Sequence, residues 1–243
     1  FELNENGVVQ TPSGPHHFYE QGSLSSFSQQ VHGRNDAAET YLQQPLEREV
    51  VIAKLNWTKG PITLSGRVHW SNSFVEQYLQ SPWWDTNFEI TFDGNPFLSQ
   101  NVLEQWMNLD PSIVQNGVDA NLNGIPDTAT VRIGRTYPEA GPTIWEYDNE
   151  FTQFRLGLSY ELSENWMVEA GWSSSKIDKT TSLKNGLLIA NVRQALLLDV
   201  SDPSDVKCSD SSNGCVPANI YGAIQMSEAA QEFITHDRTT AQQ

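Results

Sequence analysis

The most constraining feature of this sequence is a stretch of strict alternation between apolar and polar residues at positions 150–173. On its first arm apolar side chains occupy every second position, and polar residues or glycine fill the positions between them. Residues 163–165, Ser-Glu-Asn, supply turn chemistry, and a second arm then alternates in the same way. A period of two is typical of a β-strand with one apolar face. The stretch therefore predicts a β-hairpin with strands at about 150–162 and 166–175.

A second hairpin of the same design is predicted at residues 47–57 and 62–73. Its arms alternate in the same way, and Lys-Gly-Pro at 59–61 provides a tight reversal. Residues 1–9 are expected to contribute a further strand. The remaining sequence has no strand period, and three segments are expected to be long loops: 10–46, 74–149 and 176–238. Within the last loop, short helices are predicted at 187–198 and at 227–234, the latter with Ser227 as N-cap.

This order places every tight turn on one side of the sheet and every long loop on the other. A soluble sandwich has no reason to sort its loops in this way, whereas outer-membrane barrels have short periplasmic turns and long extracellular loops. Their strands also need only about 9–11 residues to cross the bilayer. The predicted fold class is therefore all-β: an antiparallel transmembrane β-barrel segment whose extracellular loops carry short helices. A soluble β-sheet is the alternative.

Composition excludes some functions. The chain has 30 acidic and 14 basic residues and a net charge of −16, which argues against nucleic acid as a partner because phosphate binding needs a basic face. No run of 18 apolar residues is present, so a helical membrane span is not expected. A search for a nucleophile elbow, a zinc-protease helix, a P-loop or a dinucleotide-binding glycine pattern finds none, and we do not expect an enzyme.

The two cysteines, Cys208 and Cys215, lie in a polar Ser/Asn/Gly-rich loop. Such a loop could close a disulfide, which would indicate an oxidising compartment. The alternative is a pair of free thiols.

Three stretches carry further motifs: GCVPANIYGAIQMSEAAQEFI at 214–234, RLGLSYELSENWMVEAGWSSSKID at 155–178 and YLQQPLEREVVIAKLNW at 41–57. All three resemble segments of TonB-dependent outer-membrane receptors. The first is similar to the family's Cys-Val-Pro, Asn-Ile-aromatic-Gly and Ser-initiated helix. The second resembles a barrel hairpin with Asn-Trp after its turn, and the third resembles the Pro-x-Glu-Arg entry into a barrel strand.

The resemblance implies a barrel of about 22 strands in the outer membrane of a Gram-negative cell, filled by an N-terminal plug. Such receptors take up siderophores, cobalamin or oligosaccharides with energy passed on by the TonB complex. Their partners are therefore outer-membrane lipid, the plug, TonB and a small-molecule or oligosaccharide substrate. Nothing here resembles the plug or the TonB-binding segment, and the start has no signal peptide. We therefore expect residues 1–243 to be an internal part of the barrel of a longer receptor.

On this interpretation the two faces of the strands have different surroundings. The lumen face would carry Arg67, His69, Arg155 and Glu161. The lipid face would carry Val51, Leu55, Leu64, Val68, Leu156, Leu158, Val168 and Trp172. The competing hypothesis is a secreted β-rich binding or adhesion module, stabilised by calcium and a disulfide.

The sharpest local motif is Asp-Ala-Asn-Leu-Asn-Gly-Ile-Pro-Asp at residues 119–127. Oxygen side chains at alternate positions and a glycine at the sixth match the way a short calcium loop presents its ligands. Thr130 stands where an EF-hand would have glutamate, so a complete hand is not predicted. The same residues also suit a turn without metal. The expected calcium ligands are Asp119, Asn121, Asn123, the Ile125 carbonyl and Asp127.

Two further groups of side chains are candidates for binding. Loop aromatics could stack on a sugar or an aromatic ligand, or they could pack the loop itself. They are Trp83, Trp84, Phe88 and Phe92. His16 and His17 could bind a transition metal, but adjacent residues of an extended chain point to opposite faces and no third ligand is evident.

Overall fold

The computed structural model describes residues 4–19, 23–35, 40–41, 43–222 and 226–242. The chain divides into two compact units. What we call the core unit consists of residues 1–40, 79–143 and 185–237, and what we call the sheet unit consists of residues 41–78, 144–184 and 238–243.

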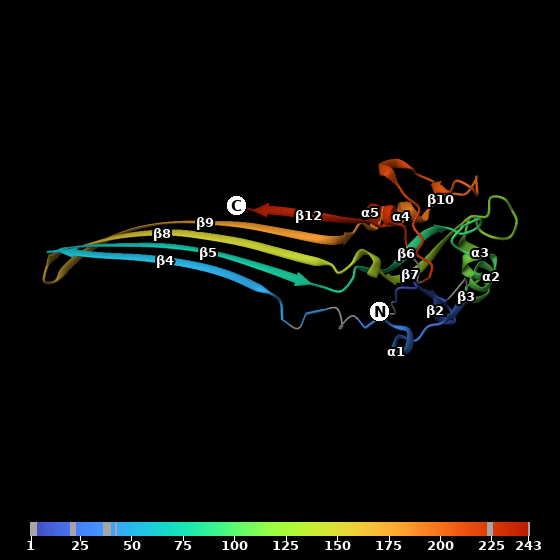
Figure 1. The fold of residues 1–243 in the computed structure, drawn as a ribbon, viewed down its shortest axis with the longest axis horizontal. Coiled ribbons are helices and arrows are strands. Elements are labelled where there is room, and N and C mark those ends of the chain that lie inside the picture. Colours follow the sequence, from blue (N-terminus) through green and yellow to red (C-terminus); the bar gives the residue numbers. More distant parts are fainter. Residues whose placement is uncertain (1–3, 20–22, 36–39, 42, 223–225, 243) are drawn as a thin grey trace. The chain divides into compact units, whose positions relative to one another are not determined.

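The sheet unit is built on one antiparallel sheet of five strands in the order β12-β9-β8-β5-β4. The sheet is a meander, because neighbours in space are also successive long strands of the chain (Figure 1). The strands are β4 (Leu46–Lys59), β5 (Ile62–Tyr78), β8 (Ile144–Ser163), β9 (Trp166–Leu187) and β12 (Thr235–Gln242). All four hairpin strands predicted from the sequence are present, and each extends beyond its predicted bounds.

Two tight turns join these strands at the same end of the sheet (Figure 1). Lys59 pairs with Ile62, so only two residues connect β4 to β5, and Gly60 takes a positive φ of 58° that favours glycine. At the other turn Ser163 pairs with Trp166. Long connections join β5 to β8 and β9 to β12, which confirms the predicted alternation of short and long connections.

The core unit contains a second antiparallel sheet, in the order β3-β2-β1-β7-β6. Its strands are β1 (Val8–Thr11), β2 (Gly14–Tyr19), β3 (Ser23–Ser26), β6 (Trp83–Thr91) and β7 (Thr128–Thr136). This corrects the prediction that 10–46 and 74–149 are loops. It also corrects the expected strand at 1–9, because Val8 and Val9 begin β1 of this smaller sheet; residues 1–3 lie outside the described residues.

Short helices accompany the core sheet. They are α1 (Gln29–His32), α2 (Gln100–Leu109), α3 (Ser112–Asn116), α4 (Ile189–Leu196) and α5 (Glu228–Ile234). Single 3₁₀ turns lie at Pro138–Ala140 and Ser212–Gly214, and β10 (Leu198–Asp199) pairs with β11 (Lys207–Cys208). The two predicted helices correspond to α4 and α5. Ser227 caps α5, because its hydroxyl accepts a hydrogen bond from the Ala230 amide at 3.2 Å.

The hydrophobic core lies in the core unit. Trp106 of α2 is 1% exposed and packs edge-on to Phe18 at 5.5 Å and beside Phe92 at 5.5 Å between ring centroids. The inward residues of β6 and β7, and of α4 and α5, complete the same cluster. The core unit therefore has the buried apolar centre of an ordinary globular domain.

Neither sheet closes on itself in the part of the chain that the structure describes. Among the described residues, no helix has the length and apolar character needed to cross a membrane.

Candidate functional site

One face of the sheet unit is apolar and exposed. The register aligns its residues in rows across the strands, such as Leu55, Gly66, Leu156 and Trp172. We call this surface the apolar belt. Its residues are Val51, Ala53, Leu55, Trp57, Ile62, Leu64, Gly66, Val68, Trp70, Phe154, Leu156, Leu158, Tyr160, Val168, Ala170 and Trp172.

The eight residues predicted to face lipid all belong to this belt, and none is buried. Their exposed fractions run from 38% at Val68 to 70% at Leu55. Side chains of this kind in a soluble protein would normally be covered by a second layer.

The belt has a defined length along the strands. From Val51 to Lys59 the strand advances about 27 Å at ~3.4 Å per residue. If the strands tilt by about 40° from a barrel axis, this length along the strand spans roughly 20 Å along the axis. The apolar band of outer-membrane barrels is similar, at about 25 Å. Aromatic side chains mark both ends, with Tyr160 and Trp166 near the tight turns and Trp70 at the opposite end. Beyond Trp70 the next row is polar and includes Glu49 and Glu150.

A glycine shapes the surface of the belt. Gly66 lies in register between Leu55 and Leu156, and without a side chain there the sheet is hollowed. The hollow is lined chiefly by Leu55, Leu64, Leu156, Leu158 and Trp172. A Cβ at Gly66 would meet Leu156 at 3.8 Å, which is ordinary contact, so the hollow could be filled without a clash.

The reverse face of the sheet is mainly polar. By register it carries the four residues predicted for the lumen: Arg67, His69, Arg155 and Glu161. Lys54, Arg67 and Arg155 lie side by side in one row, which we call the cation row. The exception is an apolar row farther from the tight turns, formed by Val50, Phe151 and Ile177, in which Phe151 makes an edge contact with His69.

The predicted calcium loop lies between α3 and β7 and is closed by its own hydrogen bonds. The Asp119 carboxylate accepts from the amides of Asn123 at 3.2 Å and Gly124 at 3.0 Å. The Asn123 side-chain oxygen accepts from the Ile125 amide at 2.8 Å, and Asp127 accepts from the amide of Ala120 at 2.6 Å. The motif therefore folds as a series of Asx turns.

Sequence reasoning missed a further carboxylate at this loop. Asp93, just after β6, accepts from the side-chain amides of Asn121 at 3.2 Å and Asn123 at 2.8 Å. Asp127 accepts from the same Asn121 amide at 2.9 Å. The donor set of carboxylates and amide oxygens suits a hard cation such as Ca²⁺. In the hydrogen-bonded arrangement seen here, however, no three carboxylate, histidine or cysteine side chains of the described residues converge as metal ligands.

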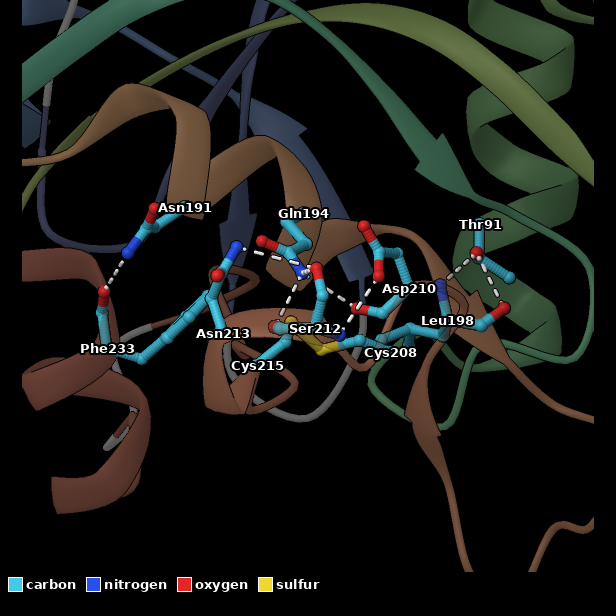
Figure 2. Close-up of a disulfide and its surroundings, with 10 residues drawn as sticks. All are labelled: Thr91, Asn191, Gln194, Leu198, Cys208, Asp210, Ser212, Asn213, Cys215 and Phe233. Atoms are coloured by element: carbon cyan, nitrogen blue, oxygen red, sulfur yellow. Dashed lines mark hydrogen bonds between the residues drawn. A yellow bond between two sulfur atoms is a disulfide. The ribbon is translucent and has the colours of Figure 1, made fainter.

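The predicted disulfide is present. Cys208 of β11 is bonded to Cys215, with 6.1 Å between their Cα atoms (Figure 2). The loop it closes is held to α4 by Gln194, whose side-chain amide donates to the carbonyls of Asp210 at 2.8 Å and Ser212 at 2.9 Å. The Ser212 backbone amide also donates to the Asp210 carboxylate, which lowers the pKa of Asp210.

The structure corrects the prediction of ligand-facing aromatics. Trp84, Phe88 and Phe92 are at most 3% exposed and belong to the hydrophobic core, because β6 directs its even-numbered side chains inward. Trp84 packs against Tyr137 at 3.8 Å between ring centroids. Only Trp83, on the outer face of β6, retains an exposed surface.

The adjacent histidines point to opposite faces of β2. His17 is buried, stacks on His32 at 4.6 Å between ring centroids, and lies 3.3 Å from the Asn4 side-chain amide. Burial, and then the neighbouring His32, lowers the pKa of His17. His16 bonds instead to the Gly14 carbonyl at 3.0 Å. A shared metal on His16 and His17 is not compatible with these opposite directions.

A buried ion pair in the core unit was not foreseen. Arg135 is fully buried, and its guanidinium donates to Glu139 at 2.5 Å and to the Glu5 carbonyl at 2.9 Å. It also lies 4.4 Å from the centre of the Tyr137 ring. Burial raises the pKa of the Tyr137 hydroxyl. Arg135 and Tyr137 are enclosed by the core and Glu139 is half-buried, which is best explained as a structural cluster.

No protein-family model, curated protein or solved structure matches this chain. The features of the chain that bear on its function are therefore the apolar belt, the polar face behind it and the sequence resemblance. Of these, the belt is the largest departure from the surface of an ordinary soluble domain.

Proposed function

We propose that the sheet unit is a section of the wall of an outer-membrane β-barrel. In this proposal the chain supplies barrel strands and outward-facing loops to a TonB-dependent receptor that takes up a siderophore, cobalamin or oligosaccharide-type substrate. The observation that carries the proposal is the exposed apolar belt, which crosses four strands and ends in aromatic residues and a polar row.

The two faces of the sheet support a membrane wall in different ways. Lipid removes the cost of exposing the belt to water, at roughly 25 cal/mol per Å² of apolar surface. The reverse face cannot also contact lipid, because a lysine or arginine on a barrel's lipid face costs about 2–4 kcal/mol at mid-depth. The cation row lies at the level of Leu55 and Leu156. That face therefore requires water or protein, as the lumen of a barrel provides.

In a membrane wall the two edge strands of the sheet need further strands to pair with. In the described part of the chain β4 and β12 each have one unpaired edge. Unpaired backbone groups cost several kcal/mol each in lipid, and even the smallest barrels have about eight strands. Additional strands, together with a plug, would complete the barrel.

The lengths of the connections indicate which end of the sheet would face the periplasm. The tight turns at Gly60 and at residues 163–165 would face the periplasm. The long connections, at 79–143 and 188–234, leave the opposite end of the sheet and would lie outside the cell. The Cys208–Cys215 disulfide is consistent with this placement, because disulfides persist in oxidising compartments. Energy from TonB would reach the complete receptor through its plug.

The proposal can be tested with cysteines placed on neighbouring residues of opposite faces. Leu158 lies in the belt and Ser159 on the polar face. In native membranes, a water-soluble maleimide should label Ser159→Cys and leave Leu158→Cys unlabelled until detergent is added. The native cysteines are already paired, so each variant has one free thiol. Equal labelling of both variants without detergent, or recovery of the chain in the soluble fraction, would reject the membrane wall.

The second candidate is a secreted binding or adhesion module stabilised by calcium and a disulfide. It is favoured by the core unit, which has its own buried core, a disulfide and the 119–127 loop beside Asp93. This second candidate does not explain what covers the exposed apolar belt. A monomeric chain that remains soluble without detergent would favour this candidate.

A further inference from the structure

The polar face of the sheet unit carries three cations directly beside one another. Lys54 is paired with Arg67 across β4 and β5, and Arg67 is paired with Arg155 across β5 and β8. Directly opposite residues of an antiparallel pair have Cβ atoms about 4.5–5.5 Å apart, and like charges at that position are destabilising. In a chain with only 14 basic residues, this arrangement needs a compensating charge.

No acidic side chain of the described residues supplies that charge. The rows on either side contain no carboxylate; their members are Asn56, Ser65, Gly157 and Gly171 on one side and Ile52, His69, Gln153 and Ser175 on the other. Glu169 lies two rows away, about 13 Å along the strands at ~3.3 Å per residue. In the part of the chain that the structure describes, none of the three cations forms an ion pair.

Arg67 lies in the middle of the cation row, and one of its N–H donors has no hydrogen-bond acceptor. Its Nε atom is shielded from solvent and has no acceptor, while the side chains of Lys54 and Arg155 are exposed. A shielded donor without an acceptor is destabilising, and more so when the group is charged. An oxyanion above the row would neutralise the repulsion, and it would reach the shielded Nε atom once the Arg67 guanidinium turns toward it.

The adjacent row leaves space for such a group. Gly157 and Gly171 have no side chains, and Ser65 is small. A Cβ at Gly157 would lie 2.5 Å from the Ser65 hydroxyl, so a larger residue there would require that hydroxyl to turn away. A ligand group can therefore approach the guanidinium groups from the side of these residues.

We propose that Lys54, Arg67 and Arg155 form an oxyanion-binding subsite for a carboxylate or phosphate group. Guanidinium groups bind both through paired N–H donors, and Lys54 adds a point charge. This inference rests on the proposed function for its location, since a barrel would place the row in the lumen at mid-depth. There it would select a substrate that carries an anionic oxygen group.

The test uses the full chain in a non-ionic detergent and a buffer without oxyanions. Thermal unfolding is followed while inorganic phosphate or citrate is added, with sodium chloride at the same ionic strength as the reference. We expect phosphate, citrate or both to raise the melting temperature beyond the effect of chloride. A response to phosphate alone assigns a phosphate group, and a response to citrate alone assigns a carboxylate.

Two variants and one matched control make the test specific. Arg67→Gln and Arg155→Gln should each weaken the oxyanion response at least about tenfold, and should melt no lower than the unmodified chain when oxyanion is absent, because repulsion is relieved. Arg48→Gln removes the same charge from the same face, three rows away, and should respond like the unmodified chain.

An effect no larger than that of chloride, or an equal loss in Arg48→Gln, would overturn the subsite. This result is separable from the membrane test. Cysteine labelling can fail while the oxyanion response persists, which would leave a subsite on a sheet outside the membrane. The reverse result would leave a barrel wall without this subsite.

Discussion

The indole nitrogen of Trp70 donates a hydrogen bond to the Glu150 carboxylate at 2.9 Å, across β5 and β8. Trp70 is the last apolar residue of the belt on its strand, and Glu150 belongs to the polar row that follows. A tryptophan with its ring toward apolar surroundings and its N–H toward polar ones is typical of a membrane interface. This pair therefore marks the expected outer boundary of the bilayer on the sheet.

Replacing a belt residue by a charge should weaken membrane insertion. We expect Leu158→Arg to lower the free energy of unfolding from vesicles by about 2–4 kcal/mol, the cost of an arginine at mid-depth. The measurement is a denaturant titration of the chain in lipid vesicles. Ser159→Arg is the matched control, because it lies on the other face directly opposite Glu169 and should change little. Similar losses in both variants would show that the faces are not distinguished by lipid.

The buried pair of Arg135 and Glu139 should be sensitive to loss of one partner. Arg135→Met leaves Glu139 without its ion pair, and we expect the core unit to lose about 3–5 kcal/mol of unfolding free energy in urea. Adding Glu139→Leu should recover most of that loss, since no uncompensated charge remains. Lys207→Ala, which breaks an exposed surface pair with Asp205, should leave the transition unchanged. A double variant no more stable than the single one would contradict this explanation.

Reduction of the disulfide should destabilise the core unit. Cys208 and Cys215 close a loop of about eight residues, for which the loop-entropy model gives about 2–3 kcal/mol. The expected result is a lower urea midpoint in the presence of a thiol reductant. A variant with both cysteines replaced by serine should match the reduced chain and ignore the reductant. If that variant unfolds at the midpoint of the oxidised chain, the disulfide contributes no stability.

Calcium should stabilise the 119–127 loop if its oxygen atoms bind the ion. After treatment with a chelator, we expect added Ca²⁺ to raise the melting temperature, with a weaker effect of Mg²⁺ because it demands stricter geometry. Asp93→Asn and Asp119→Asn should each reduce the response. Asp202→Asn makes the same change in an exposed Asx turn elsewhere and serves as the control. No response to Ca²⁺ in the unmodified chain would leave the loop a turn without metal.

The stability of the core unit should fall as the pH decreases below about 6.5. Burial lowers the pKa of His17 in the folded chain, so the unfolded chain binds its proton first. The contribution of this histidine is fully present above its ordinary pKa and is lost as the pH falls toward the lowered value. Urea midpoints between pH 5 and 7.5, roughly the range of histidine titration, measure this slope. The slope should flatten in His17→Gln and not in His69→Gln; an unchanged slope in His17→Gln would assign it to other groups.

The two long hairpins could be predicted because the information is local. Each of their strands alternates, and a two-residue turn such as Gly60-Pro61 fixes the register, so the sequence also predicts which residues share a face. For this reason Leu156 and Leu158 are predicted to share one face of the sheet, and the register places them there. The extension of β8 and β9 beyond the belt has weaker alternation and was underestimated.

The core sheet illustrates what escaped prediction. β6 does alternate, with Trp84, Phe88 and Ile90 between polar residues, but Pro and Gly residues around it favoured a loop. Its pairing with β7, and that of Val8 with Gly134, joins residues far apart in sequence, for which no local signal exists. Asp93 was missed beside the 119–127 loop for the same reason.

The interleaving of the two units along the chain has a consequence for the order of folding. The core unit draws on three separate segments, so pairing β1 with β7 requires the closure of a loop of more than a hundred residues. By contrast, β4 with β5 and β8 with β9 form from adjacent residues. Because long-range contacts form slowly, the hairpins should appear early and the core late. During that interval the apolar side chains of the hairpins and of the core segments would be uncovered. The nascent chain would then depend on a chaperone or a lipid surface to avoid aggregation.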